Sequence, residues 1–130
     1  MKEVKIKEVK TIRSYKDLMA YQKAYKMSLE LHKLTLNFPK FEQFELASQI
    51  RRASKSIAMN IAEGFSKKGH TSLAEFKRFV KISLGSNDEL RVCLEYCKDL
   101  NYIDEDTYIY YENLCIEIGK LLTSMHKNWT

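Results

Sequence analysis

Proline and glycine, the residues that most often interrupt helices and strands, are scarce in this sequence. Its 130 residues include one Pro and four Gly. Because both residues mark turns, the chain has few connections and long elements between them. This pattern favours helices over many short strands, and the length suits one domain with its own hydrophobic core.

Apolar residues recur at helical spacing in four segments, which predict helices near 17–37, 43–65, 72–100 and 105–126. The first helix should end before Pro39, because a proline pushes the preceding residue out of the helical region. The second should stop at Gly64, which the polar stretch SKKGH follows closely. Ser72, with Glu75 three residues later, resembles a capping box, and Asp104 is the expected N-cap of the last helix.

Each predicted helix carries one apolar face. The faces consist of Leu18, Tyr21, Tyr25 and Leu29, with Ala24, Met27, Leu31, Leu34 and Leu36 beside them; Leu46, Ile50, Ala53, Ile57 and Ile61; Leu73, Phe76, Val80, Asn87, Leu90, Leu94 and Cys97; and Tyr108, Tyr111, Cys115, Ile118, Leu122 and Met125. Four such helices bury these faces most simply as an antiparallel, up-down-up-down four-helix bundle, an all-α fold expected to cover residues 15–130. Residues 1–14 lie outside this scheme as a basic arm, extended or disordered.

The net charge of +5 is unevenly distributed. Residues 1–13 carry five basic and two acidic side chains, whereas residues from 104 onward carry two basic and five acidic ones. No apolar run approaches the roughly 18 residues of a membrane span, and the first residues lack the apolar stretch of a signal peptide. Three cysteines do not make a disulfide framework. We therefore expect a cytoplasmic protein with free thiols and no membrane contact.

Metal sites and catalytic sites are not indicated. A di-metal bundle needs a Glu followed by a His three residues later, and His32, His70 and His126 lack that Glu. Cys93 and Cys97 are one helical turn apart and could bind a metal with Cys115, but free cysteines on apolar faces favour a buried core. No nucleophile elbow and no phosphate-binding glycine loop is visible. The sequence predicts neither an enzyme nor a cofactor.

Gly85 lies inside the third predicted helix, where glycine costs about 1 kcal/mol relative to alanine. We interpret it as a site of close helix approach. With a turn near Lys68, an antiparallel register places Gly85 opposite Arg52 and Ala53, and it places Glu89 near Arg52. The prediction is therefore a close crossing at Ala53 and Gly85, with a partly buried ion pair between Arg52 and Glu89.

Two polar residues of the second helix, Asn60 and Glu63, could form an inward network or a solvated face. The surrounding Ile57, Ile61 and Gly64 favour the network.

Four segments of the chain match a known pattern in order. They are YKDLMAYQKAYKMSLELHKLTLNFP, ELASQIRRASKSIAMNIAEG, EFKRFVKISLGSNDEL and LNYID. Over about residues 15–125 the sequence resembles the four-helix-bundle proteins encoded in 23S ribosomal RNA intervening sequences. The most specific pieces supply a candidate structural motif: Arg52, Ala53, Asn60, Glu63, Gly64, Gly85, Ser86 and Glu89.

The resemblance implies a four-helix bundle that assembles as a homopentamer and has a nucleic-acid role. A related branch of the family resembles the accessory subunit of diversity-generating retroelements, which binds a reverse transcriptase and nucleic acid. The basic arm is not part of the pattern, so the resemblance implies nothing about it.

Basic side chains on the second and third predicted helices are candidates for phosphate contacts. They are Arg51, Lys55, Lys67, Lys68, Lys77, Arg78 and Lys81. The alternative is a solvated face, because residues 71–103 contain five basic and five acidic side chains. We expect a non-enzymatic homo-oligomer that binds RNA or DNA; a protein-interaction scaffold, such as a reverse-transcriptase accessory subunit, is the alternative.

Overall fold

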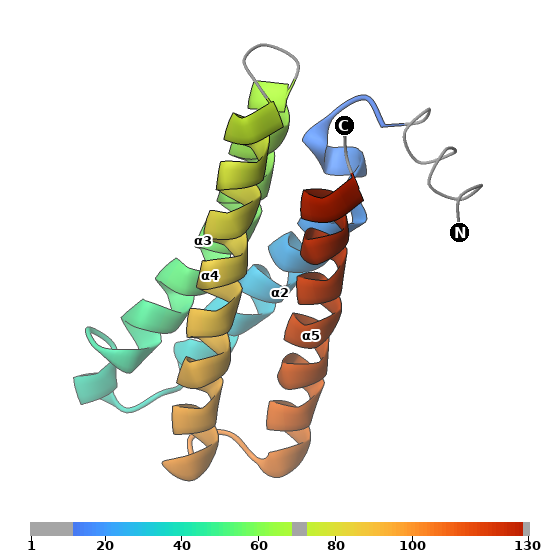
Figure 1. Cartoon of the computed structure of the whole chain (residues 1–130). Coiled ribbons are helices and arrows are strands. Elements are labelled where there is room, and N and C mark those ends of the chain that lie inside the picture. Colours follow the sequence, from blue (N-terminus) through green and yellow to red (C-terminus); the bar gives the residue numbers. More distant parts are fainter. Residues whose placement is uncertain (1–11, 69–72, 129–130) are drawn as a thin grey trace.

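The computed structural model describes residues 12–68 and 73–128, which fold into four long helices with short 3-10 turns before and between them (Figure 1). The helices are α2 (Met19–Thr35), α3 (Leu46–Lys68), α4 (Leu73–Asp99) and α5 (Glu105–Asn128), and the 3-10 turns are η1 (Tyr15–Asp17) and η2 (Lys40–Glu42). Successive helices are antiparallel, and those two ranges contain no strand. The predicted all-α four-helix bundle is confirmed, with helix ends that differ from the predictions by a few residues. The predicted cap at Ser72 lies outside the described residues.

The first described residues are already attached to the bundle. Ile12 packs against the core, and Ser14 and Asp17 form a capping box around η1. Asp17 accepts hydrogen bonds from the backbone N–H of Arg13 at 2.8 Å and of Ser14 at 3.1 Å, and these bonds lower the pKa of its carboxyl group. Asp17 therefore belongs to η1, and α2 begins only at Met19. Of the predicted arm at 1–14, residues 1–11 lie outside the described residues.

The core is built from the predicted faces of α3, α4 and α5. Its largest fully buried side chains on these helices are Ile50, Ile57, Ile61, Phe76, Val80, Leu90, Leu94, Ile118 and Leu122. Cys93, Cys97 and Cys115 are buried as free thiols, as predicted. None of the described helices is long and apolar enough to cross a membrane.

The predicted apolar face of α2 is wrong in part. Ala20, Ala24, Met27 and Leu31 face the core, whereas Tyr25 is 49% exposed and Leu29 is 46% exposed. The helix has two adjacent apolar stripes, and only one of them is needed to fill the bundle. The other remains at the surface beside α3.

The close approach between α3 and α4 occurs at Gly64 and not at Gly85. A Cβ atom on Gly64 would lie 2.9 Å from the Cβ of Phe79 and 3.3 Å from the carbonyl oxygen of Phe76, whereas a Cβ on Gly85 would meet nothing within 4 Å. The predicted crossing at Ala53 and Gly85 is therefore wrong. The predicted stop at Gly64 is also wrong, since α3 continues to Lys68. Because α3 extends to Lys68 and α4 begins at Leu73, Lys68 is not the centre of the turn. The residues of α3 and α4 that face each other therefore differ from the predicted pairs.

The new register also removes the predicted ion pair. Glu89 accepts a hydrogen bond from the Gln49 side chain at 3.3 Å, and none of the ion pairs among the described residues joins it to Arg52. Asn87 faces α5, where its amide donates to the carbonyl oxygen of Cys115 at 2.9 Å. Arg91 of α4 pairs with Glu112 of α5 at 2.7 Å.

The predicted polar network of α3 forms around Asn60 but leaves out Glu63. The Asn60 amide donates to the hydroxyl of Ser56 at 3.0 Å, and that hydroxyl lies 2.8 Å from the hydroxyl of Ser86 on α4. Glu63 is exposed and pairs with Lys67 at 3.8 Å. Ser56 and Ser86 thus connect the two helices, with Asn60 bonded to Ser56, while Glu63 belongs to the surface.

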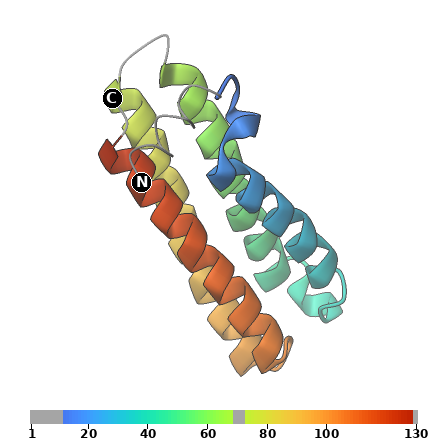
Figure 2. The same cartoon turned by 90° about the vertical axis from the view of Figure 1, so that its right-hand side faces the viewer.

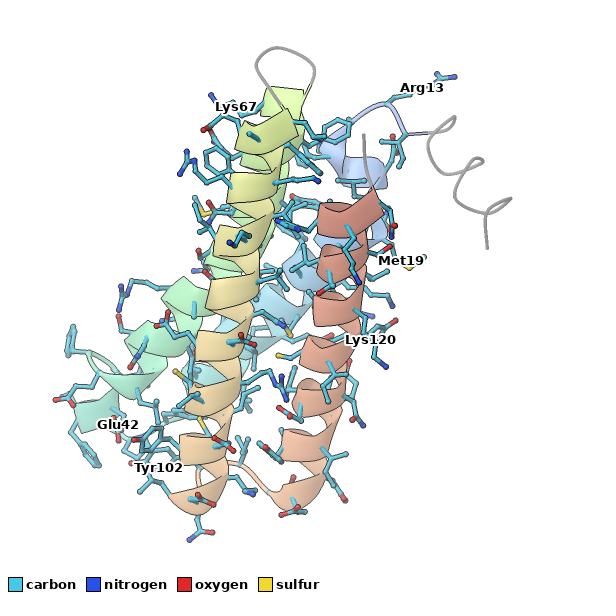
Figure 3. All side chains as sticks on the ribbon, in the orientation of Figure 1. Arg13, Met19, Glu42, Lys67, Tyr102 and Lys120 are labelled. Carbon is cyan, nitrogen blue, oxygen red and sulfur yellow. The ribbon has the colours of Figure 1, made fainter. Side chains whose placement is uncertain are left out.

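A long-range contact joins the α2–α3 connection to the α4–α5 connection at the end of the bundle that carries η2. The hydroxyl of Tyr102 donates to Glu42 at 2.8 Å, and the ring of Tyr102 packs on Phe38 with 5.2 Å between centroids. Figure 3 shows Glu42 and Tyr102 close together at this end. Helix α5 begins as predicted, because the Asp104 side chain caps it by accepting a hydrogen bond from the backbone N–H of Thr107 at 2.8 Å.

Candidate nucleic-acid interface

The basic charge of the folded domain is concentrated in its first half. Residues 12–68 contain eleven basic and five acidic side chains, a net charge of +6, whereas residues 73–128 contain seven basic and ten acidic ones, a net charge of −3. These two halves of the sequence also form two sides of the bundle: Figure 2 shows α2 beside α3 on one side and α4 beside α5 on the other. The part of the bundle suited to phosphate contact is therefore the α2–α3 half.

Arg51, although basic, has a structural role within that half. Its guanidinium donates to the Thr35 hydroxyl at 3.0 Å, to the Gln43 side chain at 3.3 Å and to the Gln43 carbonyl oxygen at 2.9 Å. These bonds hold the connection between α2 and α3. Since its donors are directed into the protein, we remove Arg51 from the candidate phosphate contacts.

Lys55 is exposed on the side of α3 that faces α2. Its ammonium lies 3.1 Å from the Nδ1 atom of His32, and no carboxylate among the described residues pairs with it. Its positive charge is thus available to an anionic ligand.

The other predicted contacts lie around the end of α3 and the start of α4, and several of them are paired. Lys67, near the upper end of α3 in Figure 3, pairs with Glu63. Arg78 forms two hydrogen bonds of 3.1 Å with Glu75 and lies 4.6 Å from the centroid of the Phe79 ring. The Arg78 hydrogen bonds lower the pKa of Glu75.

Two further lysines follow on α4, where Lys81 is exposed and Lys77 is half-buried. The side chain of Lys68 lies outside the described residues. The structure thus separates the predicted cluster into Lys55 on the α2–α3 face and a second group at the α3–α4 end.

Sequence reasoning missed the contribution of η1 and α2. Lys16, Lys26 and Lys33 are exposed there, in a segment that carries five basic and two acidic side chains between residues 12 and 35. Comparing the charge of residues 12–68 with that of residues 73–128 would have found them.

A groove about 500 Å³ in volume runs along the α2–α3 half; we call it the tyrosine groove. Its lining includes Tyr15, Tyr21, Tyr25, Leu29, Lys55 and Met59. The rings of Tyr15 and Tyr21 meet edge to face at 4.9 Å, and those of Tyr21 and Tyr25 stack at 5.8 Å with 20° between their planes. Burial raises the pKa of the Tyr21 hydroxyl, and the neighbouring Tyr15 and Tyr25 add to this effect. The groove therefore presents aromatic rings beside an available positive charge.

No group of three or more His, Cys, Asp or Glu side chains among residues 12–68 and 73–128 is arranged to hold a metal ion. Burial raises the pKa of Cys97 and of Cys115 to about 12, so these thiols are protonated at neutral pH. The cysteines thus behave as core residues.

The comparisons with known proteins agree with this architecture. The family model of the 23S rRNA-intervening sequence protein matches residues 16–124. A crystal structure from Bacteroides thetaiotaomicron, of a protein with unknown function from the S23 ribosomal protein family, superposes with a TM-score of 0.73 at 27% identity, covering 85% of this chain and 100% of that one. No curated protein matches the chain. Because this family model matches residues 16–124, nearly all of the described bundle, the chain belongs to the 23S rRNA-intervening sequence protein family.

Proposed function

We propose that this protein is a non-enzymatic homo-oligomer that binds nucleic acid, RNA in particular, through the basic surface of its α2–α3 half. The observation that carries the proposal is the division of charge, with +6 on residues 12–68 and −3 on residues 73–128. A polyanion is attracted to the first half and repelled by the second, so the asymmetry favours one orientation of binding. The family description names an intervening sequence of 23S rRNA, and we therefore propose RNA as the first nucleic acid to test.

The exposed lysines of the basic half are the proposed phosphate contacts. They are Lys16, Lys26, Lys33 and Lys55. We further propose that the sequence-predicted cations Lys67, Lys68, Lys77, Arg78 and Lys81 continue these contacts beyond the basic half, around the α3–α4 end. In an oligomer several copies of this surface act together, so weak individual contacts add through avidity.

Salt dependence measured on two matched double variants tests the proposal. One variant combines Lys26→Gln and Lys55→Gln; the control combines Lys120→Gln and Lys127→Gln, which are not proposed contacts. Each removes two exposed positive charges, so the net charge falls equally. Phosphate contacts release counterions, so RNA affinity of the unmodified oligomer should fall steeply between about 50 and 200 mM salt.

The basic-half variant should bind more weakly, with a salt slope smaller by about one for each phosphate contact removed, and the control should lose much less. Equal losses in the two variants would contradict binding through the α2–α3 half. If the oligomer, purified at low salt, binds no nucleic acid at all, the proposed function is wrong.

A protein-interaction scaffold is the second candidate, and a different surface favours it. At the end of the bundle that carries η2, Phe44 is 91% exposed, and Phe41, Tyr96 and Leu100 are also exposed. Exposed apolar groups gathered at one end are typical of protein contacts. A reverse transcriptase is one possible partner of such a scaffold.

A partner protein held mainly by apolar contacts should remain bound across the same salt range. Replacing Phe44 with Ser should release that partner and leave RNA affinity unchanged. Affinity purification of the unmodified protein and of this variant from the native host, followed by identification of proteins and RNA, therefore separates the two functions.

A further inference from the structure

The tyrosine groove combines two features that the phosphate-binding surface alone does not require. Tyr15, Tyr21 and Tyr25 form a continuous ladder of rings with centroid distances of 4.9 and 5.8 Å. Tyr15 and Tyr21 are half-buried and pack against the core, whereas Tyr25 is exposed, since Met27 and Leu31 of the same helix fill the core. Tyr25 is therefore the ring of the ladder that is open to whatever lies in the groove.

The outer part of the groove is open. Tyr25 is 49% exposed, and Met59, across the groove on α3, is 68% exposed. Small side chains, Ala58 and Ala62, are also part of its lining. A flat ring can therefore enter between α2 and α3 and lie against Tyr25 without displacing a large side chain.

The charge around the groove favours an anionic occupant. Lys55 lies in it without a carboxylate partner among the described residues, and the acidic Glu63 at the same groove is paired with Lys67. Aromatic rings beside lysines in a surface of net charge +6 are typical of sites that stack bases while binding the backbone phosphates.

We infer that the tyrosine groove is a subsite for single-stranded nucleic acid, in which an unpaired base stacks on Tyr25 and the adjoining phosphate contacts Lys55. A duplex does not fit this role, because its bases are already stacked inside the helix and cannot reach a groove. The inference rests on the proposed nucleic-acid function and adds the form of the ligand to it.

Three single variants of the intact oligomer test this subsite. Tyr25→Leu keeps an apolar side chain and removes the ring, Tyr25→Phe keeps the ring, and Tyr96→Leu removes a similarly exposed ring from α4, outside the groove (59% exposed). Fluorescence anisotropy would measure the binding of an unstructured, labelled oligouridine of about 16 nucleotides and of an RNA duplex of the same length.

Tyr25→Leu should weaken oligouridine binding about 5- to 100-fold, the range expected for losing one base–aromatic stack. Its duplex affinity and the slope of affinity against salt should be unchanged, since no cation is lost. Tyr25→Phe and Tyr96→Leu should bind like the unmodified protein. Lys55→Gln should instead reduce the salt slope by about one.

The inference is overturned if Tyr25→Leu binds oligouridine as tightly as the unmodified protein, or loses affinity equally for single strand and duplex. It is also overturned if light scattering shows that Tyr25→Leu changes the mass of the oligomer, because the groove is then a contact between copies. In each of these cases the salt-dependent RNA binding of the unmodified protein still tests the proposed function independently.

Discussion

Gly64 of α3 packs directly against Phe79 of α4, so closely that a Cβ atom at Gly64 would lie 2.9 Å from the Cβ of Phe79. Neither this atom nor the nearby carbonyl oxygen of Phe76 is the end of a flexible side chain. The two helices approach each other at this position because residue 64 has no side chain. Gly85, in contrast, is an exposed helical residue with open space around it.

Alanine at these two glycines should change stability in opposite directions. Gly64→Ala should lower the free energy of unfolding by about 1–3 kcal/mol, because overpacking outweighs the gain in helix propensity. Gly85→Ala should raise it by about 0.5–1 kcal/mol, because alanine is the better helix former and meets no neighbour. Urea denaturation followed by circular dichroism checks both values. Destabilisation by Gly85→Ala would contradict the helix register described here.

Two adjacent arginines of α3 should differ in their effect on stability. Arg51→Ala removes three hydrogen bonds to Thr35 and Gln43 and should lower the free energy of unfolding by about 1–3 kcal/mol. Arg52 is exposed, and Arg52→Ala should stay within about 0.5 kcal/mol of the unmodified protein. Thermal unfolding of the two variants side by side makes the comparison. An equal loss in both would show that the Arg51 bonds do not stabilise the connection.

The buried thiols should react slowly and should make the fold sensitive to alkali. Burial raises the pKa of Cys97 and Cys115 to about 12, so at pH 8 neither forms much thiolate. A thiol-specific reagent should modify them only after denaturant unfolds the protein. Reaction of both in the native protein at the rate of a free thiol would contradict their burial.

The raised pKa of Cys97 and Cys115 also determines how the free energy of unfolding changes with pH. Because the folded-state pKa lies above that of an unfolded thiol, about 8.5, the contribution to stability is complete below that pH. It is lost as the pH rises towards 12. The Cys115→Ser variant should show a smaller alkaline loss of stability than the unmodified protein.

The sequence predicted the fold well because helix signals are local. The N-cap at Asp104 and the buried faces of α3, α4 and α5 follow from spacing and residue type alone. The register between α3 and α4 does not, since it depends on where the turn falls. Placing the turn at Lys68 led to the wrong glycine, and Gly64, which looks like a helix stop, is the residue that permits close packing.

The candidate site was predicted less well for a related reason. Periodicity shows that Tyr21, Tyr25 and Leu29 share one side of a helix but not whether that side is needed for the core. Tyr21 packs partly against the core, but Tyr25 and Leu29 are exposed, because the stripe of Ala24, Met27 and Leu31 fills the bundle. In the same way, composition marks Arg51 as a cation, and only the structure shows that its donors are used within the protein.

The hydrogen bond between Tyr102 and Glu42 has a consequence for the order of folding. It joins residues 60 positions apart, whereas α3 and α4 are joined by a short connection. Closing the longer stretch of chain costs more entropy, so we expect the α3–α4 hairpin to form first and the end that carries Phe38, Glu42 and Tyr102 to form late. Contacts made after the rate-limiting step slow unfolding without speeding folding. We therefore expect contacts at this end of the bundle to govern the unfolding rate, and contacts within the α3–α4 hairpin to govern the folding rate.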